Sequence, residues 1–463
     1  MWLPRLSAAW QLNDKTVVRG GYGTYYDTLN VMNQGADQYG FARATVTNLT
    51  NDFGTTWNAG NPGAGISPLS DPFPVRANGT RFDAPLRDGL GSMARVGQGL
   101  TFTDFNRQHP RVQRWRVGVQ REISANMMIE VAYWGQMADR VAVNTRQDFL
   151  PESYWNSTTT RNNALANELN RNVPNPFHIS NFQDLRTSNP TLYQHMSALG
   201  RFANPMIPKN QLLREFPHMN GLNNNAIPSG KASTHSLEVN FQRRFAKGFN
   251  LNASYGATRQ MRWDILENEF NREPSIWWPS DTARPHRVTV TGIYELPFGK
   301  GRPFLQSGIG NHMFGGWQIA GTYEFQNGPQ LAWGNIFYRG DLDNFESDAS
   351  LGGEKTLNQW FNTGLPFERV ASNQPAGYQT RVFPRYLNGL RADGLNQWNV
   401  NVLREFRFGE RVRFQVRGDA INLANRSQMN PPDLNPVSTN FGRVVSQTSS
   451  LNRMYQFQGR FVF

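Results

Sequence analysis

The chain of 463 residues contains no cysteine and no long apolar run. Without cysteine it can form no disulfide, no thiolate nucleophile and no Cys-based zinc site, which fits a protein exported through an oxidising compartment. A membrane-spanning helix needs roughly 18 consecutive apolar residues, and no stretch of this sequence approaches that length. Helical membrane spans are therefore excluded, whereas a membrane β-barrel is not, because only alternate residues of its strands face lipid.

Recognisable catalytic motifs are also missing. The seven histidines are scattered, and none forms an HExxH motif or a short metal-ligand pair. Residues 89–94 match the loose GxGxxA dinucleotide pattern, but they follow residues 85–88 and not a buried strand, which argues against nucleotide binding. Nucleophilic triads and phosphate loops are absent, so the sequence predicts no enzyme activity and no cofactor.

One acidic cluster is a weak candidate for a metal site. Asp341, Asp343, Glu346 and Asp348 are close in the sequence and offer the carboxylate oxygens that calcium prefers. Their spacing lacks the glycine and the closing glutamate of an EF-hand loop, so a solvated acidic loop is the favoured interpretation.

The formal net charge of +12 is compatible with binding to nucleic acid or to an anionic surface. However, the basic residues form neither runs nor a helical stripe. They are scattered singly along alternating segments, which indicates one polar face of a sheet. Nucleic acid is therefore not an expected partner.

The last stretch, residues 451–463, alternates between two kinds of side chain. Alternation with period two predicts a β-strand with one aromatic and one mostly polar face. The chain stops on an aromatic residue, with no polar tail, which is rare in a soluble protein. An ordinary edge strand is the alternative interpretation of this stretch. The aromatic face holds Tyr455, Phe457, Gly459, Phe461 and Phe463, and the other face holds Met454, Gln456, Gln458, Arg460 and Val462.

The same alternation recurs earlier in the chain, which gives about eleven strands in all. The connections alternate along the chain: they are short turns always at one end of the strands and long loops always at the other, and these loops are far longer than the connections of compact soluble domains. The predicted earlier strands are residues 3–12, 16–26, 111–123, 127–143, 236–245, 249–258, 286–296, 316–326, 397–407 and 411–423. The predicted long loops are about 27–109, 144–231, 264–283, 334–392 and 427–449.

This asymmetry is typical of membrane β-barrels, which have short turns at one end and long loops at the other. The sequence therefore predicts an all-β fold, the antiparallel wall of a transmembrane β-barrel. A basic residue facing lipid at mid-membrane would cost roughly 2–4 kcal/mol, so the charged strand residues are expected to line an aqueous interior. The predicted lumen-facing residues are Arg114, Arg116, Glu122, Arg413, Arg417 and Arg460. Inward arginines would favour anionic cargo, although they are often only structural.

Tryptophans fall into two groups. Those near strand ends fit an interfacial girdle, and they are Trp10, Trp115, Trp263, Trp333 and Trp398. Those in the long loops would stack on a sugar or another ligand, or would pack the loops on one another, and packing is the favoured alternative. This second group is Trp57, Trp155, Trp277, Trp278 and Trp360.

Several separated stretches resemble one family, in the same order along the chain. They are PRLSAAWQLNDKTVVRGGYGTYYD (residues 4–27), RPHRVTVTGIYELPFGKGR (284–302), GGWQIAGTYEFQNG (315–328), LNGLRADGLNQWNVNVLREF (387–406), INLANR (421–426) and STNFGRV (438–444). They are similar to the C-terminal barrel of TonB-dependent outer-membrane receptors, in the Oar-like branch that often carries a carboxypeptidase-regulatory-like domain. Ala424 is a mild departure, since relatives more often have an aromatic there.

The resemblance implies a barrel of about 22 strands in the outer membrane of a Gram-negative bacterium, of which this chain would form the C-terminal half. It implies as partners the outer-membrane lipid, the barrel-assembly machinery that reads Tyr455, Phe457, Gly459, Phe461 and Phe463, and the TonB complex. The plug domain, the TonB box and the first half of the wall are missing, and residues 1–10 show no secretory signal. A C-terminal fragment is therefore expected. It should form an open or partly curled sheet, with its first and last strands unpaired with each other.

Three functions compete. The leading hypothesis is energised import of a bulky nutrient, by a wall that is not competent alone. The second is a structural or adhesive outer-membrane barrel that displays long loops, and the third is a soluble β-rich protein that binds carbohydrate or single-stranded nucleic acid. The transported substrate cannot be read from the sequence.

Overall fold

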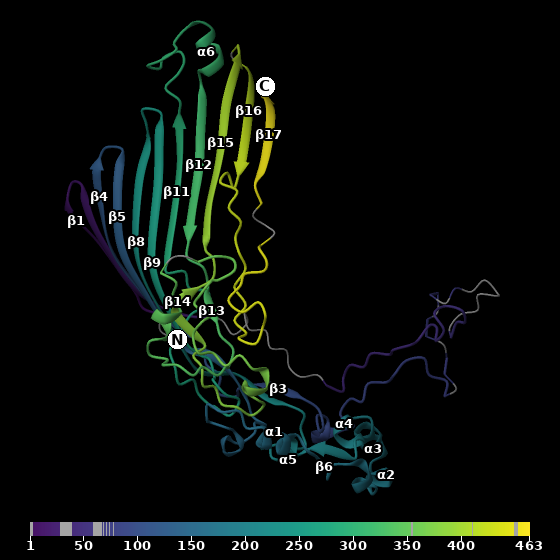
Figure 1. Ribbon diagram of the computed structural model, residues 1–463. Coiled ribbons are helices and arrows are strands. Elements are labelled where there is room, and N and C mark those ends of the chain that lie inside the picture. Colours follow the sequence, from purple (N-terminus) through teal and green to yellow (C-terminus); the bar gives the residue numbers. More distant parts are fainter. Residues whose placement is uncertain are drawn as a thin grey trace.

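The computed structural model is organised around one long, curled antiparallel sheet with a layer of loops and short helices at one end (Figure 1). The structure describes residues 3–27, 39–58, 67, 69–70, 72–73, 75–76, 78–352, 355–409, 411–448 and 452–463. Parts of the predicted loops 27–109, 334–392 and 427–449 and the start of the predicted terminal strand, residue 451, lie outside the described residues.

Eleven strands follow one another in the sheet in sequence order, as the alternating pattern predicts. They are β1 (Arg5–Asn13), β2 (Thr16–Tyr26), β4 (Arg111–Ser124), β5 (Met127–Arg146), β8 (Leu222–Ala246), β9 (Phe249–Trp263), β11 (His286–Glu295), β12 (Trp317–Gln326), β15 (Leu395–Phe408), β16 (Val412–Ile421) and β17 (Met454–Val462). Two short strands join the sheet from the side: β3 (Leu100–Thr103) runs parallel to β8, and β10 (Trp278–Pro279) pairs with β9.

The remaining elements are short and lie mainly in the connections. Two small sheets pair β6 (Asn172–Pro174) with β7 (Met206–Pro208) and β13 (Gln330–Ala332) with β14 (Tyr386–Arg391). The helices are α1 (Asn163–Asn170), α2 (Leu185–Ser188), α3 (Pro190–Ser197), α4 (Gly200–Ala203), α5 (Lys209–Leu212), α6 (Gly308–Phe314) and α7 (Phe345–Ala349). The 3-10 helices of the described residues are η2 (Gly91–Met93), η3 (Glu152–Tyr154), η4 (Ile179–Phe182) and η5 (Ala371–Asn373).

Tight turns at one end of the sheet set the register. Lys247 and Gly248 connect β8 to β9 with φ angles of 54° and 76°, a left-handed conformation that glycine adopts without strain. In the β1–β2 turn, the backbone N–H of Lys15 donates to Asn13 Oδ1 at 3.0 Å. The β11–β12 connection is an exception, because residues 296–316 contain α6 and form no tight turn, which corrects the expectation of short turns throughout this end.

Side chains sort onto two faces of the sheet. Directly paired residues on adjacent strands share a face, so an apolar row crosses eight strands from β1 to β12: Trp10, Val18, Val119, Val131, Val239, Tyr255, Val288 and Phe325. A polar row on the other face runs beside it: Gln120, Glu130, Asn240, Ser254, Thr289, Glu324 and Gln397. A sheet that is apolar on one face and polar on the other has the pattern of a barrel wall with a wet interior.

The largest clusters of buried apolar side chains belong to the loop layer and not to the sheet. One cluster gathers Trp333, Phe345, Phe361, Phe383 and Phe441 with their neighbours. A smaller cluster packs α3 and α4 against the segment around Leu90 through Leu192, Met196 and Phe202. The sheet itself encloses no sandwich-like core among the described residues, so its apolar face remains open to the surroundings.

Two boundary expectations are wrong. Residues 222–231, predicted as the end of the loop 144–231, belong to β8, and β5 extends to Arg146. Trp333, predicted at a membrane interface, is 2% exposed and packs within the larger loop cluster, where its ring lies edge-to-face with Phe361 at 5.2 Å between centroids. The predicted loop 144–231 also contains α1 to α5 and is folded.

Candidate functional site

The polar face of the sheet carries an open hollow of about 760 Å³. Strands β9, β11, β12, β15, β16 and β17 all contribute to it, and side-chain amides dominate its lining. The amides belong to Asn250, Asn252, Asn399, Asn401, Gln456 and Gln458. Amides both donate and accept hydrogen bonds and carry no charge, and the charged lining residues Arg417 and Asp419 pair with each other, so this surface suits water and polar solutes better than one specific ion.

The six predicted lumen-facing residues all lie on this polar face, at alternating positions of β4, β16 and β17. Arg116 forms ion pairs with Glu130 at 2.9 Å and Glu238 at 3.7 Å, and so links β4, β5 and β8. Arg417 pairs with Asp419 at 2.7 Å. Because Arg116 and Arg417 have carboxylate partners, these two arginines brace the wall and add less positive charge to it than their number suggests.

The opposite face carries aromatic side chains at two levels. Near the loops lie Tyr22, Trp115, Tyr133, Tyr255, Tyr323 and Trp398, and near the turns lie Trp10, Phe249, Tyr294, Phe406, Phe414 and Phe461. Trp398 and Phe406 are eight residues apart on β15, which is roughly 26 Å along a strand. With a tilt of about 40°, this spacing corresponds to roughly 20 Å, close to the height of the lipid-facing band of membrane barrels.

The terminal strand β17 contributes to the aromatic face as its alternation predicts. The rings of Phe461 and Phe414 stack at 4.4 Å, and Phe463 follows at 6.3 Å from Phe461. On its other side β17 pairs with no described strand, and neither does β1 at the far edge of the sheet. The first and last strands of the described sheet are therefore not paired with each other.

The five loop tryptophans do not converge on one site. Trp155, Trp278 and Trp360 are held by the loop layer, where each indole N–H donates a hydrogen bond: to the carbonyl of Leu150 at 3.0 Å, to Glu267 Oε1 at 2.8 Å and to the carbonyl of Arg391 at 2.8 Å. Trp57 and Trp277 remain 43% and 40% exposed. Trp155, Trp278 and Trp360 therefore pack the loops, and of these five tryptophans only Trp57 and Trp277 keep open ring faces.

The acidic residues of the candidate calcium site are not gathered around a common point. Asp341 accepts hydrogen bonds from the backbone N–H of Asp343 and from Asn344, both at 2.9 Å, while Glu346 belongs to α7 and lies against Gly389. In the part of the chain that the structure describes, no three His, Asp or Glu side chains are placed to hold a metal ion.

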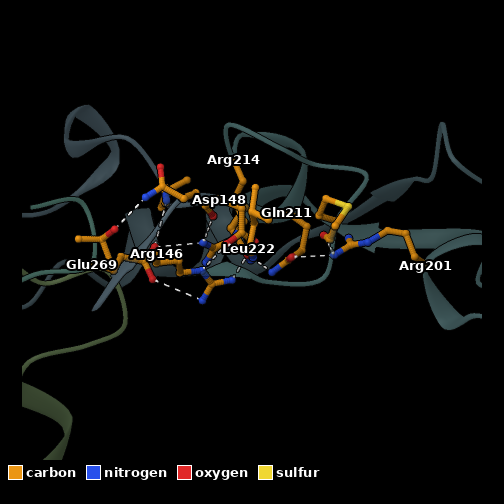
Figure 2. A network of polar contacts seen from close by, with 12 residues as sticks. Arg146, Asp148, Arg201, Gln211, Arg214, Leu222 and Glu269 are labelled. Atoms are coloured by element: carbon orange, nitrogen blue, oxygen red, sulfur yellow. Dashed lines mark hydrogen bonds and ion pairs between the residues drawn. The ribbon is translucent and has the colours of Figure 1, made fainter. Parts of the chain in front are cut away.

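A network of arginines and carboxylates joins the loop layer to the ends of the strands (Figure 2). Asp148, whose side chain is 1% exposed, accepts from Arg146 Nε at 2.9 Å and from the Leu222 backbone N–H at 2.8 Å. Arg214 donates to the carbonyl of Asp148 at 2.7 Å and to Glu269 Oε1 at 3.1 Å. Burial alone would raise the pKa of Asp148, but these hydrogen bonds and the charges of Arg146 and Arg214 outweigh burial and lower that pKa.

This network was not predicted from the sequence, although the sequence contains a signal for it. Arg146 and Asp148 are two residues apart, and so are Arg262 with Asp264 and Arg417 with Asp419; all three pairs form ion pairs. Residues i and i+2 of an extended segment lie on one face, so Arg-x-Asp at a strand end predicts such a pair.

The INLANR stretch (residues 421–426) ends strand β16 with two residues in the left-handed backbone conformation. Asn422 and Asn425 both have φ of 50°, a region that asparagine tolerates better than most residues. Asn422 Oδ1 accepts from the backbone N–H of Arg426 at 3.1 Å, and Arg426 pairs with Asp393 at 2.6 Å. Two of the stretches that resemble the receptor family are thus in contact with each other.

Among the described residues, no helix is long and apolar enough to cross a membrane. The sheet has a polar hollow on one face, aromatic levels on the other and long loops at one end, and these features together define the wall of an outer-membrane β-barrel. The sequence model of the outer membrane beta barrel domain family matches residues 1–458, and the chain belongs to that family. It is accordingly a protein of the bacterial outer membrane. No curated protein matches the chain.

Solved structures with a similar arrangement are outer-membrane transporters and receptors. The outer membrane transporter YddB from Escherichia coli is 10% identical, with a TM-score of 0.42; the match covers 99% of this chain and 40% of that one. BauA, the ferric preacinetobactin receptor from Acinetobacter baumannii, is 7% identical, with a TM-score of 0.37; the match covers 99% of this chain and 36% of BauA. The ferric-catecholate import receptor Fiu from E. coli K12 is also 7% identical, with a TM-score of 0.37; the match covers 99% of this chain and 34% of Fiu. The chain thus spans 40% or less of the length of these proteins.

Proposed function

We propose that this chain forms part of the barrel wall of a TonB-dependent receptor that imports a bulky nutrient across the outer membrane. The observation that carries the proposal is the division of the sheet into an amide-lined polar face and an aromatic apolar face. Such a wall guides solutes and performs no chemistry on them. The assignment to the Oar-like branch belongs to the same proposal and rests on the sequence stretches quoted above.

The free edges of β1 and β17 support the idea that further strands complete the wall. Unpaired backbone N–H and C=O groups in lipid cost several kcal/mol each, so an open edge is not stable in a membrane. About eleven more strands would give the barrel of about 22 strands that the resemblance implies. In this proposal a plug within the barrel and the TonB complex supply gating, and the barrel-assembly machinery recognises β17.

Cysteine accessibility tests the orientation of the wall, and the absence of native cysteine makes single-cysteine variants clean. Thr291 lines the polar hollow and the adjacent Val290 points to the apolar face. In isolated outer membranes, the Thr291→Cys variant should react with a charged, membrane-impermeant maleimide. The Val290→Cys variant should react only after detergent denaturation. Equal labelling of both variants, or recovery of the protein in the soluble fraction without detergent, would refute the proposal.

Loss of TonB separates import from display. If the barrel imports a nutrient, any growth advantage that the gene confers in its native context should disappear when TonB is deleted. A display protein would keep its function and its protease-accessible loops without TonB. The folded loop layer, with its own aromatic cluster, is the feature that would suit the display alternative.

A further inference from the structure

A second hollow lies in the loop layer, away from the polar face of the sheet. It has a volume of about 650 Å³, within the range of small-molecule sites, and is formed by residues 97–99 together with the segment that carries α4, β7 and α5. Among the described residues, Arg201 is the one charged residue in its lining, and no carboxylate lines it.

The charge of Arg201 is not balanced by a carboxylate. Its guanidinium donates to Gln211 Oε1 at 3.2 Å and to the carbonyl of Met219 at 2.9 Å, both neutral acceptors, and its Nε is buried without an acceptor. No described carboxylate lies within ion-pairing distance of Arg201. The network drawn in Figure 2 contains three labelled arginines and two carboxylates, and Arg201 lies at the end that the carboxylates do not reach.

Desolvating such a cation without a counter-ion is unfavourable. Burial lowers the pKa of Arg201, the charge of Arg214 lowers it further, and the charge of Asp148 only partly offsets these effects. An anionic group entering the hollow would supply the missing counter-charge, and the planar guanidinium suits a planar carboxylate.

The rest of the lining indicates what the anionic group is attached to. The side-chain amides of Asn204 and Asn220 make no hydrogen bond within the described residues, and each offers a donor and an acceptor, as hydroxyl groups require. Leu199, Met206 and Ile207 provide an apolar wall on which the C–H face of a sugar ring could lie.

We propose that the hollow at Arg201 binds an acidic, hydroxyl-bearing organic molecule of the sugar-acid class, with its carboxylate on Arg201 and its hydroxyls on the free amides. This inference rests on the proposed function in one respect: it places the loop layer on the side of the membrane where nutrient arrives. It names a class of cargo or a component of that cargo.

The test measures binding to the full chain purified in detergent, by calorimetry or equilibrium dialysis, with galacturonate, galactose and inorganic phosphate as probes. Galacturonate should bind, and galactose, which lacks the carboxylate, should bind at least roughly tenfold more weakly, because a hydrogen bond to a charged group is lost. Inorganic phosphate should also bind more weakly than galacturonate, since it offers the amides no sugar hydroxyls. Arg201→Gln should weaken galacturonate binding by a similar factor.

Arg186→Gln is the matched control. Arg186 is an exposed arginine in the same loop region and contacts the ring of Tyr193, so its loss removes the same charge but not the site. Arg201→Gln also removes the hydrogen bonds of Arg201 to Gln211 and Met219, so Asn220→Ala, at an exposed amide, provides a second variant that should also reduce galacturonate affinity. Equal affinity of native protein and Arg201→Gln for galacturonate, equal binding of galactose, or stronger binding of phosphate would each overturn the inference. None of these results would alter the cysteine labelling of the wall, so the two proposals fail separately.

Discussion

Val290 and Thr291 are neighbours in β11, yet they belong to different environments. Val290 shares the apolar face with Tyr323 and Ala253, whereas Thr291 points into the amide-lined hollow. We expect Val290→Arg to destabilise the inserted sheet by about 2–4 kcal/mol, because a basic side chain at mid-membrane must leave water. Thr291→Arg should change stability by less than about 1 kcal/mol. Urea unfolding in lipid vesicles measures both values, and equal effects would contradict the assignment of the two faces.

Asp148 shows how one buried carboxylate holds the loop layer. Its pKa in the folded protein lies below the value in the unfolded chain, so its contribution to stability is fully present above the unfolded pKa, about 4. That contribution is lost as the pH falls through the lower, folded pKa. We therefore expect the loop layer to loosen in acid, with increased proteolysis between β5 and β8 at a pH below about 4.

The variant Asp148→Ala should reproduce this loosening at neutral pH and cost about 3 kcal/mol, because Arg146 and the backbone N–H of Leu222 would lose a buried partner. Asp341→Ala is a suitable control, since this exposed acid makes only local contacts. If the Asp148→Ala protein were as resistant to protease at pH 7 as the native protein, the network would not be structural.

At the scale of elements, alternation was a reliable guide wherever both faces of a strand had distinct environments. Strand β2 agrees with its predicted bounds, and β11 and β12 agree within one residue. The first ten residues of β8, LNNNAIPSGK, do not alternate, and their extended form depends on pairing with β5 and β3. Such tertiary pairing leaves no periodic trace in the sequence, so the end of this loop could not be predicted.

The candidate sites, too, could be predicted only where their residues lie on alternating strands. The residues of the polar face could be placed from period two, because a strand fixes the direction of each side chain. The hollow at Arg201 could not, because residues 97–99, Arg201 and Asn220 come from separate parts of two loops. Trp333 was misplaced for a similar reason: its position near a strand end suggested an interface, but the folded loops bury it.

The turn after β16 provides a test at this scale. Asn422 has φ of 50° and accepts a hydrogen bond from the Arg426 N–H at 3.1 Å, so Asn422→Ala adds backbone strain and removes a buried acceptor. We expect a loss of about 2 kcal/mol in the stability of the segment between β16 and β17, measured by hydrogen exchange. Asn425→Gly should be neutral or stabilising, because glycine adopts the same φ freely. Equal protection in both variants would contradict this account of the turn.

In the molecule as a whole, the sheet and the loop layer differ in where their apolar side chains are placed. The loop layer buries its own aromatic cluster, as a soluble domain would, while the sheet leaves its aromatic face for lipid and its polar face for water. In the described part of the chain, the two edges of the sheet have no partner strand. Every residue of β1 is exposed, and the backbone groups on its far side have no described partner.

Ala9 in β1 tests whether that edge receives another strand. The Thr24 N–H donates to the Pro4 carbonyl, and antiparallel hydrogen bonding alternates along a strand, so the N–H of Ala9 points away from β2. Ala9→Pro removes this donor. A free edge tolerates such a proline, whereas an edge paired within the membrane would lose a ladder hydrogen bond. We expect Ala9→Pro to reduce the amount of protein assembled in the outer membrane several-fold, while Ala9→Gly, which keeps the N–H, assembles nearly as well as the native protein. Membrane yields that match for both variants would mean that no strand pairs with β1, and the larger barrel would have to be closed in another way.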